Sequence, residues 1–324
     1  MSLEPCSVFV VGGAGFIGSH LVQLLAERGH KVCVFDDFSV GREGFLDQAM
    51  RTGRVSLVRG DARDRSALER AMRGASAVVH LAANPEARRG LMDDRIDVAL
   101  GLETTLEVLS AMQAAKVRRL IFASSGTVYG DRAEPAGETD LGSLPVSLYG
   151  ASKLASEAFI SAHVACFDLG AVVLRFGNVV GPRATHGVIK DFVDQLVADP
   201  TKLIVLGNGT QQKPYLHVSD CAFGIHYALL HLAKGEPGQL TTWNLTPRTQ
   251  TAVRTIAEWV VAQSPNPAAE ILLGQTTRGW RGDVPVSRLL PDKLSGHGFT
   301  IHTPSDTAVQ RAISEIWAER GKPS

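Results

Sequence analysis

The sequence has little of what metal, redox and nucleic-acid-binding proteins depend on. Its four cysteines are far apart and none forms a CxxC pair, so neither a zinc site nor a redox motif is indicated. The ten histidines are scattered, without the spacing of metal ligands. Lysine plus arginine and aspartate plus glutamate number 33 each, so no overall charge attracts nucleic acid. We therefore predict no metal site and no nucleic-acid partner.

Long apolar stretches are absent as well. No run approaches the roughly 18 apolar residues that a membrane-spanning helix requires. The first five residues, Met1 to Pro5, lack the basic segment that begins a signal peptide. Hydrophobic residues make up 44% and charged residues 20% of the chain, which is typical of a globular protein with a buried core. We predict a cytoplasmic protein with no membrane association.

Short apolar runs alternate with amphipathic stretches through the first half of the chain. In one such stretch, Ile17, Leu21, Leu24 and Leu25 have the i, i+4, i+7, i+8 spacing of a helix. Repeated alternation of buried strands and helices is typical of a parallel sheet covered on both faces. We predict a doubly wound (Rossmann) α/β fold with its ligand site at the carboxyl ends of the strands. The predicted strands are 8–11, 31–35, 55–58, 77–81, 120–123 and 171–175.

The alternation loosens after about residue 176, where Gly207-Asn208-Gly209 and several prolines divide the chain into shorter pieces. An apolar run at 203–206 either returns to the first sheet or begins a small one. We predict a dinucleotide-binding domain over 1–176. A smaller substrate-binding region over 177–324 follows, with a segment that returns to the first domain.

A glycine-rich turn follows the first predicted strand. Gly12, Gly15 and Gly18 stand between that strand and a helix that begins near Phe16. Glycines at this spacing let the turn close and let the backbone approach a pyrophosphate at the helix N-terminus. The context of strand, turn and helix predicts a dinucleotide cofactor.

Acidic residues at the ends of the next strands favour NAD. Asp36 ends the second strand, 18 residues after Gly18, where a carboxylate can bind the ribose hydroxyls. Asp37 follows it, and the two charges would repel the 2′-phosphate of NADP, although Arg42 is near enough in sequence to leave that alternative open. Asp61 ends the third strand, where it can reach the adenine edge.

Tyr149 and Lys153 are four residues apart in a predicted helix, so their side chains share one face. A free phenol has a pKa of about 10, too high for a base at neutral pH. One positive charge about 4 Å away contributes roughly 4 kcal/mol at an effective dielectric near 20. At about 1.36 kcal/mol per pKa unit, that moves the phenol toward 7. Ser125, after the strand 120–123, can donate a hydrogen bond to the reacting hydroxyl. The three residues predict proton and hydride removal from an alcohol carbon.

The chain resembles the extended short-chain dehydrogenases/reductases of the NAD-dependent epimerase/dehydratase family, and most of all their UDP-glucose 4-epimerase branch. The resemblance covers nearly the whole chain. It rests on the glycine turn, Asp36, Asp61 and Tyr149/Lys153, and on the motifs at 80–83, 125–130, 175–178 and 213–218. It implies that Tyr149, as phenolate, takes the proton of the sugar 4-hydroxyl while hydride passes to NAD, and that hydride then returns to the other face of the 4-keto sugar.

The resemblance also implies the remaining contacts. For the cofactor they are Gly12, Gly15, Phe16, Ile17, Gly18, Asp36, Asp37, Asp61, Ala62, Leu81, Ala82, Ala83, Ser124, Tyr149 and Lys153. For the UDP-sugar they are Ser125, Thr127, Asn178, Lys213, Arg281 and Ser287, with Arg278 as an alternative to Arg281 for the phosphate. Ser287 aligns with a position where a small residue admits N-acetyl groups. A homodimer is implied in the same way.

Residues after Ser125 separate the branches of the family. Dehydratases carry an acidic pair at the positions of Gly126 and Thr127, and decarboxylases carry a glutamate at the second, so the sequence favours an epimerase. A UDP-glucuronate 4-epimerase and a dehydratase or 4-keto reductase of the same family remain alternatives. A regulator that binds NAD without catalysis would be expected to lack the tyrosine.

Overall fold

The computed structural model describes residues 6–321, which divide into two compact units. The first unit contains the residues up to Ser125, Ala151–Arg175 and Cys221–Trp243. The second contains Gly126–Gly150, Phe176–Asp220 and the residues from Asn244 onward. No helix in the described part of the chain combines the length and the apolar character needed to cross a membrane. Residues 1–5, where a signal peptide was considered, lie outside the described residues.

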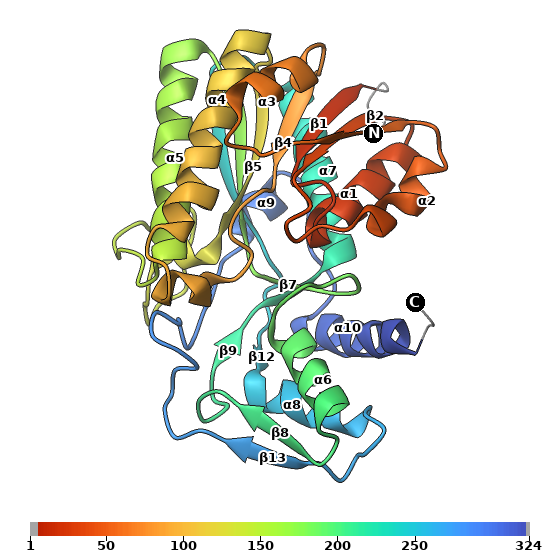
Figure 1. Ribbon diagram of the computed structural model, residues 1–324. Helices are drawn as coiled ribbons and strands as arrows, with labels where there is room; N and C mark the ends of the chain where they lie inside the picture. The colour runs from red at the N-terminus through yellow and green to blue at the C-terminus, as the bar shows by residue number, and fades with distance from the viewer. Residues whose placement is uncertain (1–5, 322–324) are drawn as a thin grey trace. The chain divides into compact units, whose positions relative to one another are not determined.

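The first unit is built on a seven-stranded sheet in the order β11-β6-β5-β4-β1-β2-β3 (Figure 1). The strands are β1 (Ser7–Val11), β2 (Lys31–Asp36), β3 (Val55–Arg59), β4 (Ala77–His80), β5 (Arg119–Ser125), β6 (Gly170–Phe176) and β11 (Leu240–Leu245). The chain runs outward from β1 to β3, then crosses back to β4, and the neighbours from β3 to β5 pair in parallel. This is the doubly wound order, and it confirms the predicted fold class.

Helices cover both faces of this sheet. On one face α3 (Arg65–Met72), α4 (Thr104–Ala115) and α5 (Leu148–Phe167) pack around a core that includes Phe9 and Phe122. The other helices of the unit are α1 (Phe16–Glu27), α2 (Asp47–Met50) and α7 (Val218–Lys234), with the short turns η1 (Glu43–Leu46), η2 (Ala87–Leu91) and η3 (Val98–Glu103). The end of α1 meets α7, where the guanidinium of Arg28 lies over the Phe223 ring.

The second unit has three two-stranded sheets around its own core. β7 (Asn178–Val180) pairs with β10 (Tyr215–His217), β9 (Gln212–Lys213) with β12 (Thr251–Ala252), and β8 (Lys202–Val205) with β13 (Glu270–Leu273). The helices are α6 (Val188–Ala198), α8 (Val253–Ala262), α9 (Asp292–Gly296) and α10 (Ser305–Arg320), with the turn η4 (Gly126–Tyr129). The apolar run at 203–206 therefore begins a small sheet. Phe192, Ile256 and Ile313 bring α6, α8 and α10 together.

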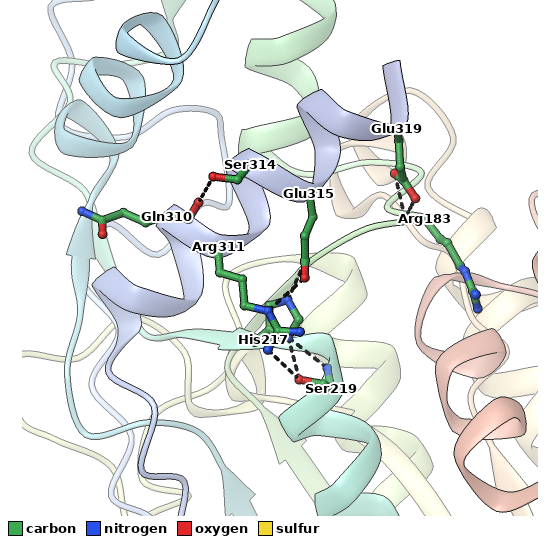
Figure 2. A network of polar contacts seen from close by, with 8 residues as sticks. All are labelled: Arg183, His217, Ser219, Gln310, Arg311, Ser314, Glu315 and Glu319. Atoms are coloured by element: carbon green, nitrogen blue, oxygen red, sulfur yellow. Dashed lines mark hydrogen bonds and ion pairs between the residues drawn. The ribbon is translucent and has the colours of Figure 1, made fainter. Parts of the chain in front are cut away.

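A polar network ties α10 to β10 inside this unit (Figure 2). The backbone N–H of Ser219 donates to Nδ1 of His217, so the ring proton is on Nε2 and is donated to Glu315 at 2.8 Å. Arg311 pairs with the same carboxylate. Burial lowers the pKa of His217, which favours this neutral form. His217 therefore has a structural role.

Candidate active site

Two glycines of the turn after β1 are required by close packing. Gly12 has φ +79°, and a side chain there would place Cβ 2.7 Å from the backbone nitrogen of Ala82. At Gly18 a Cβ would overlap the carbonyl oxygen of Gly12 and lie 2.7 Å from Cα of Gly13. Only glycine lets β1, the turn and α1 approach this closely.

Close packing does not explain the glycine at position 15. It is the N-cap of α1, with φ −74°, and it makes no side-chain cap. A Cβ there would meet nothing nearer than 3.4 Å within the protein, so neither packing nor backbone conformation requires glycine. The position opens the N-terminus of α1, at Phe16 and Ile17, to an approaching anion. The turn thus fits the pyrophosphate of a dinucleotide.

Asp36 is fixed beside this turn. It ends β2 and is 8% exposed; its Oδ2 accepts the N–H of Ala14 and its Oδ1 accepts the N–H of Phe38, both at 2.9 Å. Burial raises the pKa of Asp36, and the two N–H donors oppose that shift. The carboxylate oxygens keep lone pairs for the ribose hydroxyls predicted to bind here. The adjacent Asp37 is exposed and accepts from Ser39.

Asp61 has a partner that the sequence analysis missed. The Arg63 guanidinium binds it through Nε and Nη2, the latter at 2.6 Å, and holds the pKa of Asp61 below its usual range. The next residue, Ala62, packs against the core of the first unit. An adenine contact by Asp61 would share the carboxylate with Arg63. In the sequence, the spacing of two residues between Asp61 and Arg63 was the signal that could have indicated this ion pair.

The end of β4 lies against the glycine turn. The N–H groups of Leu81 and Ala82 both donate to the carbonyl of Val11, the last residue of β1, and Ala83 follows them. The carboxyl ends of β1, β2 and β4 therefore bring Gly12, Asp36 and Ala82 to one edge of the sheet. This is where a doubly wound fold binds its ligand.

Lys153 is a buried cation. Its side chain reaches the carbonyl of Ala123 on β5 at 2.7 Å and lies over the Phe122 ring. The residue is 3% exposed, and burial lowers the pKa of Lys153 to about 8, against the pull of Glu157 and Asp97 toward the charged form. The ammonium is therefore largely charged at neutral pH and loses its proton above pH about 8.

The structure places the catalytic candidates on two adjoining elements. Tyr149 and Lys153 are one helical turn apart in α5, as predicted, and Tyr149 is half-buried. Ser125 is the last residue of β5, two residues beyond the carbonyl that binds Lys153. β5 and α5 therefore hold Ser125 and the lysine in fixed positions.

Ser124 belongs to a buried network that the sequence did not reveal. Its hydroxyl donates to Glu157 on α5, and Glu157 in turn binds Arg175 on β6 at 2.6 Å. The Glu157 and Arg175 side chains are 9% and 3% exposed. The side chain of Ser124 is thus committed to joining β5, α5 and β6. If Ser124 contacts the cofactor as predicted, its backbone atoms would make that contact.

The basic candidates for the substrate lie in the second unit and differ in their partners. Lys213 on β9 forms an ion pair with Asp283, so its charge is already matched. Arg278 pairs with Asp131 and donates to the Asp283 carbonyl at 2.6 Å. Arg281 is exposed and forms no ion pair within residues 6–321. The structure therefore favours Arg281 over Arg278 as the arginine available for phosphate.

The other substrate candidates occupy strand and turn positions of the same unit. Asn178 is exposed at the start of β7, and its N–H donates to the Pro214 carbonyl. Ser287 is half-buried, and its N–H donates to the Gln212 carbonyl. Thr127 is half-buried in η4.

Gly126, next to Thr127, lies against the flexible side chain of Leu289. A Cβ at this position would lie 2.7 Å from Cδ1 of Leu289. An acidic side chain here, as a dehydratase would carry, would have to displace that leucine.

Comparison with known proteins places the chain in a family. A model of the NAD dependent epimerase/dehydratase family matches residues 8–245. The chain belongs to this family. The UDP-glucose 4-epimerase of Azospirillum brasilense is 32% identical over 247 residues, 70% of this chain and 69% of that protein. A solved UDP-galactose 4-epimerase superposes with a TM-score of 0.85 at 33% identity, over 98% of this chain and 100% of that one.

A further solved relative carries the cofactor. The UDP-glucose 4-epimerase of Thermus thermophilus, in complex with NAD, superposes with a TM-score of 0.83 at 30% identity, over 98% of this chain and 100% of that one. These similarities confirm the predicted family, fold and NAD cofactor, and the prediction of an NAD-dependent sugar epimerase. The residues of the glycine turn fit that cofactor.

Packing requires glycine at position 18 but not at position 15, so alanine variants of the two positions can be compared. Gly18→Ala should destabilise the fold by about 3 kcal/mol or more, because its Cβ overlaps backbone atoms that cannot move aside. Gly15→Ala should change stability by under about 1 kcal/mol and instead weaken NAD binding. Urea denaturation and calorimetric NAD titration measure the two effects. Equal loss of stability in both variants would contradict this division.

Proposed function

We propose that this chain is a UDP-hexose 4-epimerase in which Tyr149 is the general base. The observation that carries the proposal is the buried ammonium of Lys153, one turn of α5 away from the phenol and fixed to the β5 strand that ends in Ser125. NAD, when bound, accepts hydride from C4 of the sugar and returns it. The homodimer and the cytoplasmic location predicted above belong to the same proposal.

The buried charge explains how Tyr149 can act near neutral pH. A cation held in a poorly solvated position stabilises an adjacent phenolate more than a solvated lysine would. Tyr149 would take the proton from the 4-hydroxyl and give it back when the other epimer forms. Ser125 would hold the hydroxyl through a hydrogen bond. Lys153 would lower the pKa of Tyr149 and bind the nicotinamide ribose.

We assign cofactor binding to the first unit and the nucleotide sugar to residues of the second. Arg281 supports this assignment, since its guanidinium has no acidic partner in the described chain. Asn178 would donate to the diphosphate from the start of β7. Lys213 would contribute only by sharing its charge with Asp283. Asp36 and Asp61 would bind the ribose and the adenine.

An epimerase is favoured over a dehydratase because loss of water from the sugar needs an additional acid and base. Gly126 carries no acidic group, and a side chain at that position would require Leu289 to shift. Thr127 has no carboxylate either. The residues after Ser125 therefore support proton exchange at C4 alone.

The central test is proton NMR of the purified protein with UDP-glucose, UDP-N-acetylglucosamine and UDP-glucuronic acid in turn. We expect the anomeric signal of a 4-epimer without net formation of NADH. Tyr149→Phe should lower kcat by about 10²–10⁴-fold because the base is lost, whereas Tyr227→Phe should leave it unchanged. Conversion of none of the three sugars by protein with bound NAD would refute the proposal.

Arg281→Gln should raise KM for the UDP-sugar about tenfold, the effect of losing roughly 1.4 kcal/mol of charged hydrogen bonding. Stability should not change, because the side chain has no partner within the fold. Arg288→Gln is the control, since Arg288 is an exposed arginine of the same segment. An equal rise in KM in both variants would show that general charge, and not Arg281, attracts the substrate.

Ser287 tests the width of the sugar site. We predict that the wild-type protein accepts UDP-N-acetylglucosamine and that Ser287→Tyr abolishes this activity while it spares UDP-glucose. The larger side chain would occupy the volume of the N-acetyl group. Turnover of the two sugars by both proteins measures the effect. Equal loss on UDP-glucose would contradict a specific role for Ser287.

A further inference from the structure

Asp97 presents a buried carboxylate oxygen with no partner. The residue precedes η3 and is 1% exposed. Its Oδ1 accepts a hydrogen bond from Nδ2 of Asn84 at 2.9 Å, and Asn84 also donates to the Glu86 carbonyl. Within the described residues, Oδ2 is buried and accepts no hydrogen bond. A carboxylate is rarely left in this state unless a charge compensates it.

Besides Asp97 and Lys153, the first unit buries the ion pair of Glu157 and Arg175. Glu157 is matched by Arg175 and receives a further hydrogen bond from Ser124. Lys153 donates to the carbonyl of Ala123, which carries no net charge. Asp97, whose Oδ2 accepts no hydrogen bond within the described residues, is a second buried carboxylate whose charge acts on the ammonium of Lys153.

The backbone brings η3 close to the helix that carries Lys153. Asp97 is the N-cap of η3, and Gly101 lies within η3, four residues after it. A Cβ at Gly101 would lie 2.7 Å from Oγ of Ser152. Ser152 immediately precedes Lys153 in α5. Since π-helical turns are frequent at functional sites, this local geometry agrees with a role for the turn that Asp97 begins.

We propose that Asp97 is a positioning residue for the reaction: its buried carboxylate, oriented by Asn84, is a counter-charge that, with Glu157, keeps the ammonium of Lys153 protonated beside the catalytic tyrosine. The proposal rests on the proposed function for Tyr149. Without Asp97, Lys153 would lose its proton at a lower pH and cease to stabilise the phenolate. Asp97 touches neither sugar nor cofactor in this role.

The other groups around the pair do not replace Asp97. Glu157, on the same helix as Lys153, favours the charged form of Lys153 more strongly than Asp97 does, but its carboxylate is also bound by Arg175 and Ser124. His80, on β4, is neutral because burial and Lys153 lower its pKa to about 3. Around Asp97, Arg89 favours the carboxylate and Asp93 opposes it. Burial raises the pKa of Asp97, and Lys153 is among the charges that oppose this shift, so each group favours the charged form of the other.

The experiment measures the pKa of Lys153 directly, in protein with bound NAD and no sugar. Proteins labelled with ¹³C at lysine Cε are titrated by NMR, and Lys153→Met identifies the signal. Asp97→Asn removes the charge but keeps an oxygen that can accept from Asn84. Asp94→Asn is the matched control, because Asp94 is an exposed carboxylate of the same segment. Asn84→Ala tests the orientation of Asp97 without removing its charge.

We expect the pKa of Lys153 to fall by roughly one unit in Asp97→Asn and not in Asp94→Asn. The alkaline limb of the kcat profile should move by the same amount, with KM for the sugar unchanged. Asn84→Ala should give a smaller shift in the same direction. An unchanged Lys153 pKa in Asp97→Asn and Asn84→Ala would overturn the proposal. A shifted pKa in protein that epimerises no sugar would refute the proposed function and leave the charge coupling in place.

Discussion

The burial of one ammonium group constrains the catalytic part of this protein. Lys153 takes its charge out of water to reach the end of β5, and burial alone would favour its neutral form. The fold offsets this with carboxylates on η3 and α5 and with a carbonyl of β5. In the proposed mechanism, this charge stabilises the phenolate of Tyr149, one helical turn away.

One buried ion pair of the first unit is matched separately from that charge. Glu157 and Arg175 neutralise each other and, with Ser124, join three elements of the first unit. Glu157 also favours the charged form of Lys153. Paired and hydrogen-bonded charges in a core are stable, whereas a lone one is costly. The arrangement therefore separates a structural pair from a catalytic one.

The glycine turn shows a similar division of roles. Gly12 and Gly18 are glycines because strand, turn and helix meet there, and Gly15 is open to a ligand. The same short motif thus contains two positions that packing requires to be glycine and one that we propose serves binding. Asp36 links the two, since its oxygens hold the turn through Ala14 while keeping lone pairs for the ribose.

The sequence by itself determined the doubly wound fold and the family. Strands buried on both faces of a parallel sheet appear as short apolar runs, and the six predicted runs in the first half are β1 to β6. It did not show that β11 is the seventh strand, because Thr241, Thr242 and Asn244 interrupt the apolar pattern. The glycine turn and the spacing of Tyr149 and Lys153 are local in the chain. They could therefore be recognised without a structure.

Only the tertiary structure decided which charged groups are matched. Arg278 and Arg281 are equivalent candidates in the sequence, and an ion pair with Asp131, 147 residues away, separates them. Asp97 and Lys153 are far apart along the chain, and nothing local indicates that both are buried or that Asp97 has a carboxylate oxygen without a partner. The physical reason is that desolvation and pairing depend on which elements pack together. A residue's neighbours in sequence do not determine them.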